Sequence, residues 1–201
     1  MKSAIPEDLN MQRNNLRNCL LQVAPNTNLD ELNELVEQFT LDKFSKNELI
    51  YKAGGTSDTF YFIYKGLLRI YYTKEEKEIT NLFVTENQMI MGAYNIITGN
   101  KNYSNYEAFE ETYVLKINYD LLESFYLKYH SLEHLGRKLI ELYYTTFMKK
   151  TYDVLFLSAE ERYHIFLKEN ADLLNRIPLR FIASYLGIKQ ETLSRMRSKY
   201  R

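Results

Sequence analysis

The amino-acid sequence predicts an α+β protein in which a strand-rich roll is followed by a long helix and a helical C-terminal unit. Three observations predict this order. Residues 40–118 alternate apolar and polar side chains and are rich in β-branched and aromatic residues, which is typical of short strands in a roll or sandwich. Apolar residues recur at helical spacing on both sides of that segment. The last 26 residues hold seven Lys or Arg and one acid, a balance of +6, so the rest of this neutral chain carries −6.

The predicted boundaries divide the chain into three parts. Residues 1–118 are expected to form an N-terminal helix and the β-roll, residues 119–153 a dimerisation helix, and residues 154–201 a C-terminal helical domain. Helical spacing extends from about Leu9 to Phe39, and Asn28 or Asp30 is placed to cap a helix there.

Three pairs of successive strands are expected within the roll. One pair is joined at Lys65-Gly66, one is a hairpin with a charged tip in YYTKEEKEITNLF, and one lies within YEAFEETYVLKIN. Glycine at such positions favours turns because it adopts backbone angles that other residues avoid.

The segment after residue 118 has an apolar seam with a heptad step. The residues of this seam are Phe125, Leu132, Leu135, Leu139 and Leu142. Two interpretations are open: the helix packs on its own roll, or it pairs with a second copy as a parallel dimer helix. We favour the dimer, because the seam lies between the roll and a basic module.

The C-terminal stretch fits a bihelical unit rather than a basic tail. Ser158 and Glu161 form an S-x-x-E capping box that begins one helix. With Leu179 as the first position of a 20-residue unit, Ala183 falls where two helices approach and Gly187 falls at the turn. The positions expected to be buried are Ile182, Leu186, Ile188, Leu193 and Met196.

The second helix of this unit has the chemistry of a recognition helix for double-stranded DNA. Arg195 fits guanine O6 and N7, and Glu191 fits a cytosine amino group. The residues expected to contact base edges are Gln190, Glu191, Ser194 and Arg195. The residues expected to contact phosphates are Arg180, Lys189, Thr192, Arg197 and Lys199.

The order of parts, with LSAEERY followed by IPLRFIASYLGIKQETLSR, resembles the Crp/Fnr family of bacterial transcription regulators. The resemblance implies a jelly roll of the cyclic-nucleotide-binding type, a C-terminal helix-turn-helix, and homodimers on palindromic DNA. It also implies RNA polymerase as a further partner. Glu191, Ser194 and Arg195 match an E-x-x-S-R set, which suggests a TTGAT-like half-site. The family's β-wing after the recognition helix is expected to be missing or truncated, since the sequence stops at Arg201.

The expected effector site departs from the family pattern. Gly92 matches the glycine of the phosphate cassette, but Ala93 stands where a ribose-binding acid is expected, and no arginine occurs between Arg69 and Arg137. Because arginine is suited to gripping a phosphate with two hydrogen bonds, cAMP is not expected to bind in the usual way. A pocket for an unknown small molecule and a ligand-free structural roll both stay open. The residues of such a pocket would be Gly92, Ala93, Tyr94, Tyr106 and Glu107.

Other functions are not expected. No catalytic motif is present, so the chain is not expected to be an enzyme. His130 and His134 lack a third metal ligand, and Cys19 is the only cysteine, so neither a metal nor another cofactor is expected. Without an apolar segment of membrane-spanning length or a signal core, a bacterial cytoplasmic location is expected. The alternative function is a ligand-binding roll whose C-terminal unit docks a protein partner.

Overall fold

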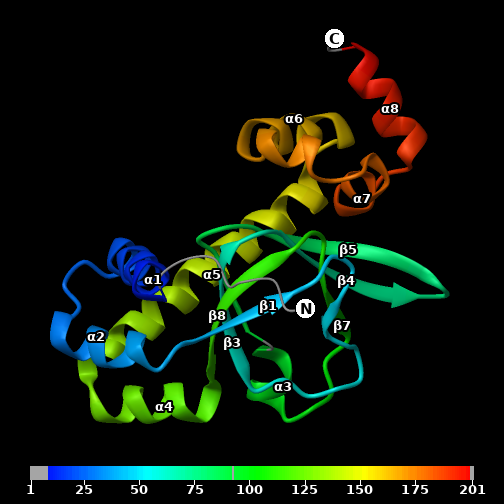
Figure 1. Cartoon of the computed structure of the whole chain (residues 1–201). Helices are drawn as coiled ribbons and strands as arrows, with labels where there is room; N and C mark the ends of the chain where they lie inside the picture. The colour runs from blue at the N-terminus through cyan, green and yellow to red at the C-terminus, as the bar shows by residue number, and fades with distance from the viewer. Residues whose placement is uncertain (1–8, 92, 200–201) are drawn as a thin grey trace.

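The computed structural model describes residues 9–91 and 93–199, and Figure 1 shows a β-roll with helices packed on two of its sides. The strands within these residues are β1 (Thr40–Phe44), β2 (Leu49–Tyr51), β3 (Thr59–Lys65), β4 (Leu68–Lys74), β5 (Lys77–Val84), β6 (Met89–Met91), β7 (Ser104–Ala108) and β8 (Thr112–Asn118). The helices are α1 (Leu9–Val23), α2 (Leu29–Glu37), α3 (Ala93–Thr98), α4 (Tyr119–Lys128), α5 (His130–Phe156), α6 (Ala159–Glu169), the 3₁₀ helix η1 (Ala171–Asn175), α7 (Leu179–Tyr185) and α8 (Gln190–Lys199).

The roll consists of two four-stranded antiparallel sheets. One has the order β1-β8-β3-β6 and the other the order β2-β7-β4-β5. The three predicted pairs of successive strands are present, and β4 and β5 form the predicted hairpin. The pairs β3–β4 and β7–β8 instead pass from one sheet to the other, and Gly66 at the β3–β4 turn has a φ of +110°. A Cβ there would lie 2.5 Å from Thr112 Oγ1, so glycine is needed for both backbone angle and space.

Strand alternation gives each sheet an inner and an outer apolar face. Side chains of the inner faces fill the roll, among them Ile63, Leu68, Ile70 and Val114. Phe62 and Leu115 point the other way and pack against α1, α2, α4 and α5. The predicted N-terminal helical region is confirmed as two helices, with the Asn28 side chain accepting hydrogen bonds from the backbone at the start of α2.

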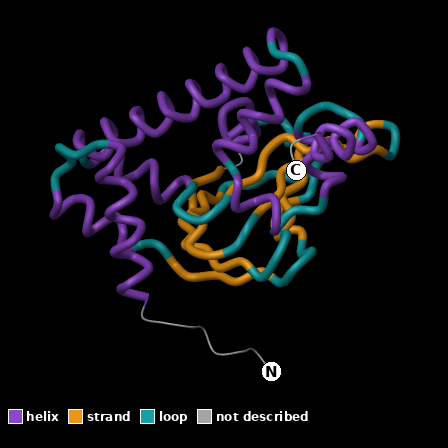
Figure 2. The backbone as a smooth tube through the Cα atoms, turned by 90° about the horizontal axis from the view of Figure 1, so that it is seen from above, coloured by secondary structure: helices purple, strands orange, loops and turns teal. Residues whose placement is uncertain are grey.

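The predicted single helix of residues 119–153 is two helices. Tyr129 lies between α4 and α5 in an extended conformation, and its hydroxyl donates a hydrogen bond to Glu34 on α2. The break folds α4 back against α5, where the Tyr126 ring lies so close to Gly136 that a Cβ would be 2.8 Å away. Figure 2 shows the resulting course of α5, which runs alongside the roll.

This break corrects the assignment of the apolar seam to a dimer surface. Phe125 lies on α4 and not on the long helix, while Leu132 and Leu135 are 0% and 1% exposed in the core that α5 forms with α1 and α2. Leu139 packs against the same core, and of this seam Leu142 is exposed. The first third of α5 therefore stabilises its own protomer, as the alternative interpretation of the seam predicted.

Substitution of Leu132 by alanine tests this assignment. Because the side chain is fully buried, Leu132→Ala is expected to lower the free energy of unfolding by about 2–5 kcal/mol in urea denaturation followed by circular dichroism. Leu127→Ala on α4 is the matched control, since Leu127 is 83% exposed, and a change within about 0.5 kcal/mol is expected. Equal effects of the two substitutions would contradict the assignment.

Candidate nucleic-acid interface

The C-terminal unit begins at a capped helix. The Ser158 hydroxyl accepts from the Glu161 backbone N–H, and the Glu161 carboxylate accepts from the Ser158 N–H, which confirms the predicted capping box of α6. These hydrogen bonds also lower the pKa of Glu161. Arg162 on α6 donates to the Leu186 carbonyl at 3.0 and 3.2 Å and thereby ties this helix to the turn between α7 and α8.

A glycine turn joins α7 to α8. Gly187 has a φ of +68°, and its N–H donates to Ser184 O while the Ile188 N–H donates to Ala183 O at 3.0 Å. These bonds satisfy the last carbonyls of α7 in the way a left-handed residue after a helix allows. The turn predicted at Gly187 is therefore confirmed.

The two helices share a core with α6. Ala183 is 1% exposed where α7 and α8 approach, which agrees with the need for a small residue there. Ile182, Leu186, Leu193 and Met196 are buried as predicted, and Ile188 is half-buried against the same cluster.

The opposite side of α8 faces solvent. Gln190, Glu191, Ser194 and Arg195 are all exposed, and residues 191, 194 and 195 lie on one side of the helix because their spacing is three and four. The Arg195 Nε donates to the Glu191 carbonyl at 3.4 Å. The helix thus presents an amide, a carboxylate, a hydroxyl and a guanidinium on a rigid element.

The predicted phosphate contacts are spread over both helices. Arg180 and Lys189 are exposed, at the start of α7 and just before α8, while Thr192 and Arg197 are half-buried. The side chain of Lys199 lies outside the side chains that the structure describes. Exposed cations near the ends of a recognition helix are well placed for a phosphate backbone.

Contacts between this unit and the rest of the chain were not foreseen from the sequence. Lys150 on α5 donates to the Asn81 side-chain oxygen at 3.1 Å and lies 4.5 Å from the Tyr185 ring centre. Burial lowers the pKa of Lys150 to about 8. The Ser184 hydroxyl accepts from the Thr80 N–H at 2.9 Å, so α7 is hydrogen-bonded directly to β5.

The expected effector site is held together by hydrogen bonds within the chain. Gly92 and the side chains of Ala93 and Tyr94 lie outside what the structure describes. The Asn95 side chain on α3 accepts from Ser57 N–H at 3.2 Å and donates to Ser57 O at 2.7 Å. The loop after β2 therefore contacts α3 directly.

Two residues of the expected pocket point in opposite directions, which corrects their grouping. Tyr106 is buried inside the roll 5.4 Å from the Tyr51 ring, and burial raises its pKa to about 12. Glu107, the next residue along β7, lies on the outer face beside Arg69, whose Nη1 is 3.5 Å from it. Because successive strand side chains alternate between faces, one cavity inside the roll cannot be lined by both.

Of the lysines and arginines whose side chains the structure describes, Arg69 alone is buried, and it faces α7 rather than the roll interior. Its guanidinium lies between the rings of Tyr71 and Phe181, 4.2 and 4.1 Å from their centres. Such stacking is favourable for arginine. It leaves the described interior of the roll without a buried cation to meet a phosphate.

The histidines of α5 make local contacts. His130 Nδ1 lies 3.4 Å from Glu133, and His134 Nδ1 lies 3.0 Å from Arg137. Within residues 9–91 and 93–199, no three His, Cys, Asp or Glu side chains are grouped to hold a metal ion. Over the same residues, no helix combines the length and apolar character needed to cross a membrane.

Residues 41–129 match the cyclic nucleotide-binding domain family, and no curated protein sequence matches the chain. Among solved structures, a regulator assigned to the crp/fnr family from Eubacterium rectale is 18% identical with a TM-score of 0.69, over 90% of this chain and 87% of that one. FixK2 from Bradyrhizobium japonicum is 21% identical with a TM-score of 0.67, over 80% and 83%. A CooA variant from Carboxydothermus hydrogenoformans is 16% identical with a TM-score of 0.66, over 83% and 78%. The chain thus carries a cyclic nucleotide-binding-type domain and has the overall fold of Crp/Fnr transcriptional regulators.

Proposed function

We propose that this protein is a sequence-specific DNA-binding regulator of transcription that acts as a homodimer on palindromic sites. The observation that carries the proposal is the exposed side of α8. Gln190, Glu191, Ser194 and Arg195 face solvent there, while Leu193 and Met196 on the other side fix the helix in a core. A helix held in this way can enter a major groove with its first residues against base edges.

The position of α8 supports DNA binding from the side away from the roll. In Figure 1, α8 extends from the top of the molecule, and α7 lies between it and the β4–β5 hairpin. The acidic body of the chain is therefore separated from the surface that would meet phosphates. Arg180 and Lys189 are exposed in the C-terminal unit and would position the protein without selecting sequence.

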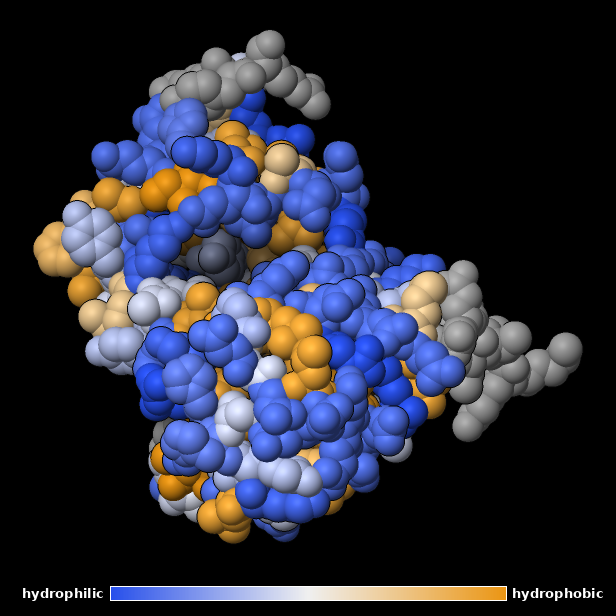
Figure 3. Space-filling view, turned by 90° about the vertical axis from the view of Figure 1, so that its left-hand side faces the viewer, coloured by the Kyte–Doolittle hydropathy of each residue, from blue (hydrophilic) through white to orange (hydrophobic). Residues whose placement is uncertain are grey.

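The second half of α5 supports the dimer. Ile140, Tyr144, Phe147 and Val154 are more than half exposed and follow one another at four, three and seven positions, so they form a stripe along the helix. Figure 3, which views the molecule from the left-hand side of Figure 1, shows hydrophobic side chains among polar ones on that face. Exposed apolar side chains that share one side of a helix mark an interaction surface, and their helical spacing suits an identical helix of a second copy.

The proposed regulator does not respond to cAMP through the usual phosphate contacts. Arg69 is committed to the outer face of the roll, and the loop after β2 is hydrogen-bonded to α3 through Ser57 and Asn95. Tyr51 and Tyr106 occupy the interior beside that loop. An effector of another kind, if one acts, would have to displace these contacts.

The remaining parts of the proposal follow from DNA binding rather than from separate observations. A transcription regulator of this kind would work in the cytoplasm of a bacterium and act with RNA polymerase. It would have no enzymatic activity of its own.

The test of DNA recognition is a random-site selection on the purified full-length protein. The wild type is expected to enrich a palindrome whose half-sites are one helical turn apart, roughly 34 Å. Arg195→Ala is expected to lose preference at one base pair per half-site, a loss of about 1–3 kcal/mol of discrimination measured by fluorescence anisotropy on matched and mismatched duplexes.

Arg137→Ala is the matched control, because Arg137 is an exposed arginine on α5 paired with Glu141 and distant in sequence from α8. It should leave both the selected sequence and the affinity unchanged. A wild-type protein that enriches no sequence would contradict the proposal and favour a unit that docks a protein partner.

The dimer is tested by placing a charge in the exposed stripe of α5. Phe147→Glu is expected to convert a dimer to a monomer in sedimentation velocity, because a carboxylate would be desolvated in the interface. Affinity for a full palindrome should fall to that for one half-site. Leu127→Glu, also at an exposed leucine but on α4, is the control and should stay dimeric. A wild-type protein that sediments as a monomer at all concentrations would refute this part of the proposal.

A further inference from the structure

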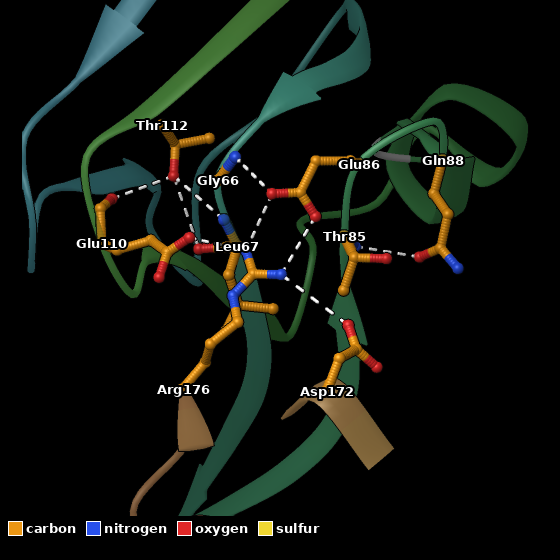
Figure 4. Close-up of polar contacts among 9 residues, drawn as sticks. All are labelled: Gly66, Leu67, Thr85, Glu86, Gln88, Glu110, Thr112, Asp172 and Arg176. Atoms are coloured by element: carbon orange, nitrogen blue, oxygen red, sulfur yellow. Dashed lines mark hydrogen bonds and ion pairs between the residues drawn. The ribbon is translucent and has the colours of Figure 1, made fainter. Parts of the chain in front are cut away.

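One arginine joins the C-terminal unit to the end of the roll. Arg176 follows η1 and lies three residues before α7. Its Nη1 donates to Glu86 at 3.1 Å, and its Nη2 donates to Glu86 at 2.8 Å and to Glu110 at 2.6 Å (Figure 4). The contact with Glu86 is bidentate, which fixes direction as well as distance. Asp172 on η1 lies 3.9 Å from the same guanidinium.

The two glutamates belong to different turns of the roll. Glu86 lies between β5 and β6, and Glu110 lies between β7 and β8. Glu86 also accepts from the Gly66 N–H at 2.9 Å, in the turn between β3 and β4. Figure 4 shows these three turns converging on Arg176. The Arg176 side chain therefore contacts a surface that three turns between the two sheets build together.

Apolar packing surrounds these ion pairs. Leu67 and Phe83 of the roll are buried in the same cluster as Ile177 and Ile182 of the C-terminal unit. Phe109, next to Glu110, meets the Phe181 ring edge to face at 5.1 Å. The C-terminal unit is thus packed on the roll through a shared core.

The charges of Arg176 and Glu86 stabilise each other. Although burial opposes it, the hydrogen bonds from Arg176 lower the pKa of Glu86, and Glu86 raises the pKa of Arg176. A carboxyl group with a lowered pKa in the folded state stabilises the fold above its unfolded pKa and loses that effect as the pH falls through the folded value. The ion pairs are therefore intact near neutral pH. Removing Arg176 would leave two partly buried carboxylates facing each other without a cation.

We infer that Arg176 is a positioning residue for the recognition helix. By holding η1 and α7 against Glu86 and Glu110, it fixes the direction of α8 relative to the roll of the same protomer. In a dimer held by α5, this direction determines how far apart the two recognition helices lie. Arg176 would therefore set the spacing between half-sites, while Arg195 and its neighbours select the half-site sequence. This inference rests on the proposed function.

The test is a selection in which a fixed half-site is repeated as a palindrome with a spacer of randomised length. The wild type is expected to enrich one spacer length. Arg176→Met is expected to select the same half-site sequence but to accept several spacer lengths, with the preference for the best length falling at least about tenfold. A purely structural role would lower affinity for every spacer equally.

Two neighbouring glutamates give a matched pair of milder variants. Glu110→Ala removes a carboxylate that contacts Arg176, while Glu111→Ala in the same turn removes one that contacts Lys43. Glu110→Ala should broaden the spacer preference and Glu111→Ala should not. Because Glu110→Ala keeps Arg176 and Glu86 paired, it remains informative if Arg176→Met fails to fold, which circular dichroism would reveal.

The outcomes separate this inference from the proposed function. A wild-type protein that enriches no palindrome overturns both. A wild-type protein that enriches a palindrome, with Glu110→Ala folded and as strict in spacing as Glu111→Ala, overturns the role of Arg176 alone. Broadened spacing with an unchanged half-site supports it.

Discussion

Each sheet of the roll has an apolar outer face that must be kept from water, and different helices cover the two faces. Helices α1, α2, α4 and the start of α5 cover the sheet that contains Phe62 and Leu115. The C-terminal unit covers the other sheet through Phe83 and the neighbouring Leu67. Because burial of such surface is the main stabilising term in folding, the place of the C-terminal unit is set by the roll itself. The direction of α8 follows from that contact.

The contact between the C-terminal unit and the roll combines charged, polar and aromatic groups. Arg69 is 1% exposed between two aromatic rings, bonded to Thr80 at 3.0 Å and to Glu78 at 2.7 Å, yet its Nη2 has no hydrogen-bond partner. An unsatisfied buried donor costs about 1–3 kcal/mol. The contact between the roll and the C-terminal unit therefore contains both strong hydrogen bonds of Arg69 and the desolvation cost of its unpaired Nη2. Such an arrangement is more directional than an apolar contact of equal area, since guanidinium groups bind in fixed geometry.

The features that the sequence predicts well are those that depend on nearby residues. The capping box of Ser158 and Glu161, the turn at Gly187 and the turn at Gly66 all follow from local backbone requirements. The break at Tyr129 was not predicted, because it depends on contacts of that side chain with α2, about 95 residues away. The choice between burial of Leu132 and Leu135 and a dimer surface could not be made from the sequence for the same reason, because a heptad pattern does not say which surface covers it.

Three arginines show why charge counting is a limited guide to function. Arg195 is exposed on α8, Arg69 is buried beside α7, and Arg176 is neutralised by two glutamates of the roll. The basic excess of the C-terminal stretch is therefore divided between solvent and the protein's own acidic turns. Salt screens exposed charges more than partly buried ones, so contacts of Arg195, Arg180 and Lys189 with DNA would weaken before the ion pairs of Arg176. The direction proposed for α8 would thus be held by charges that persist under conditions in which bound DNA would be released.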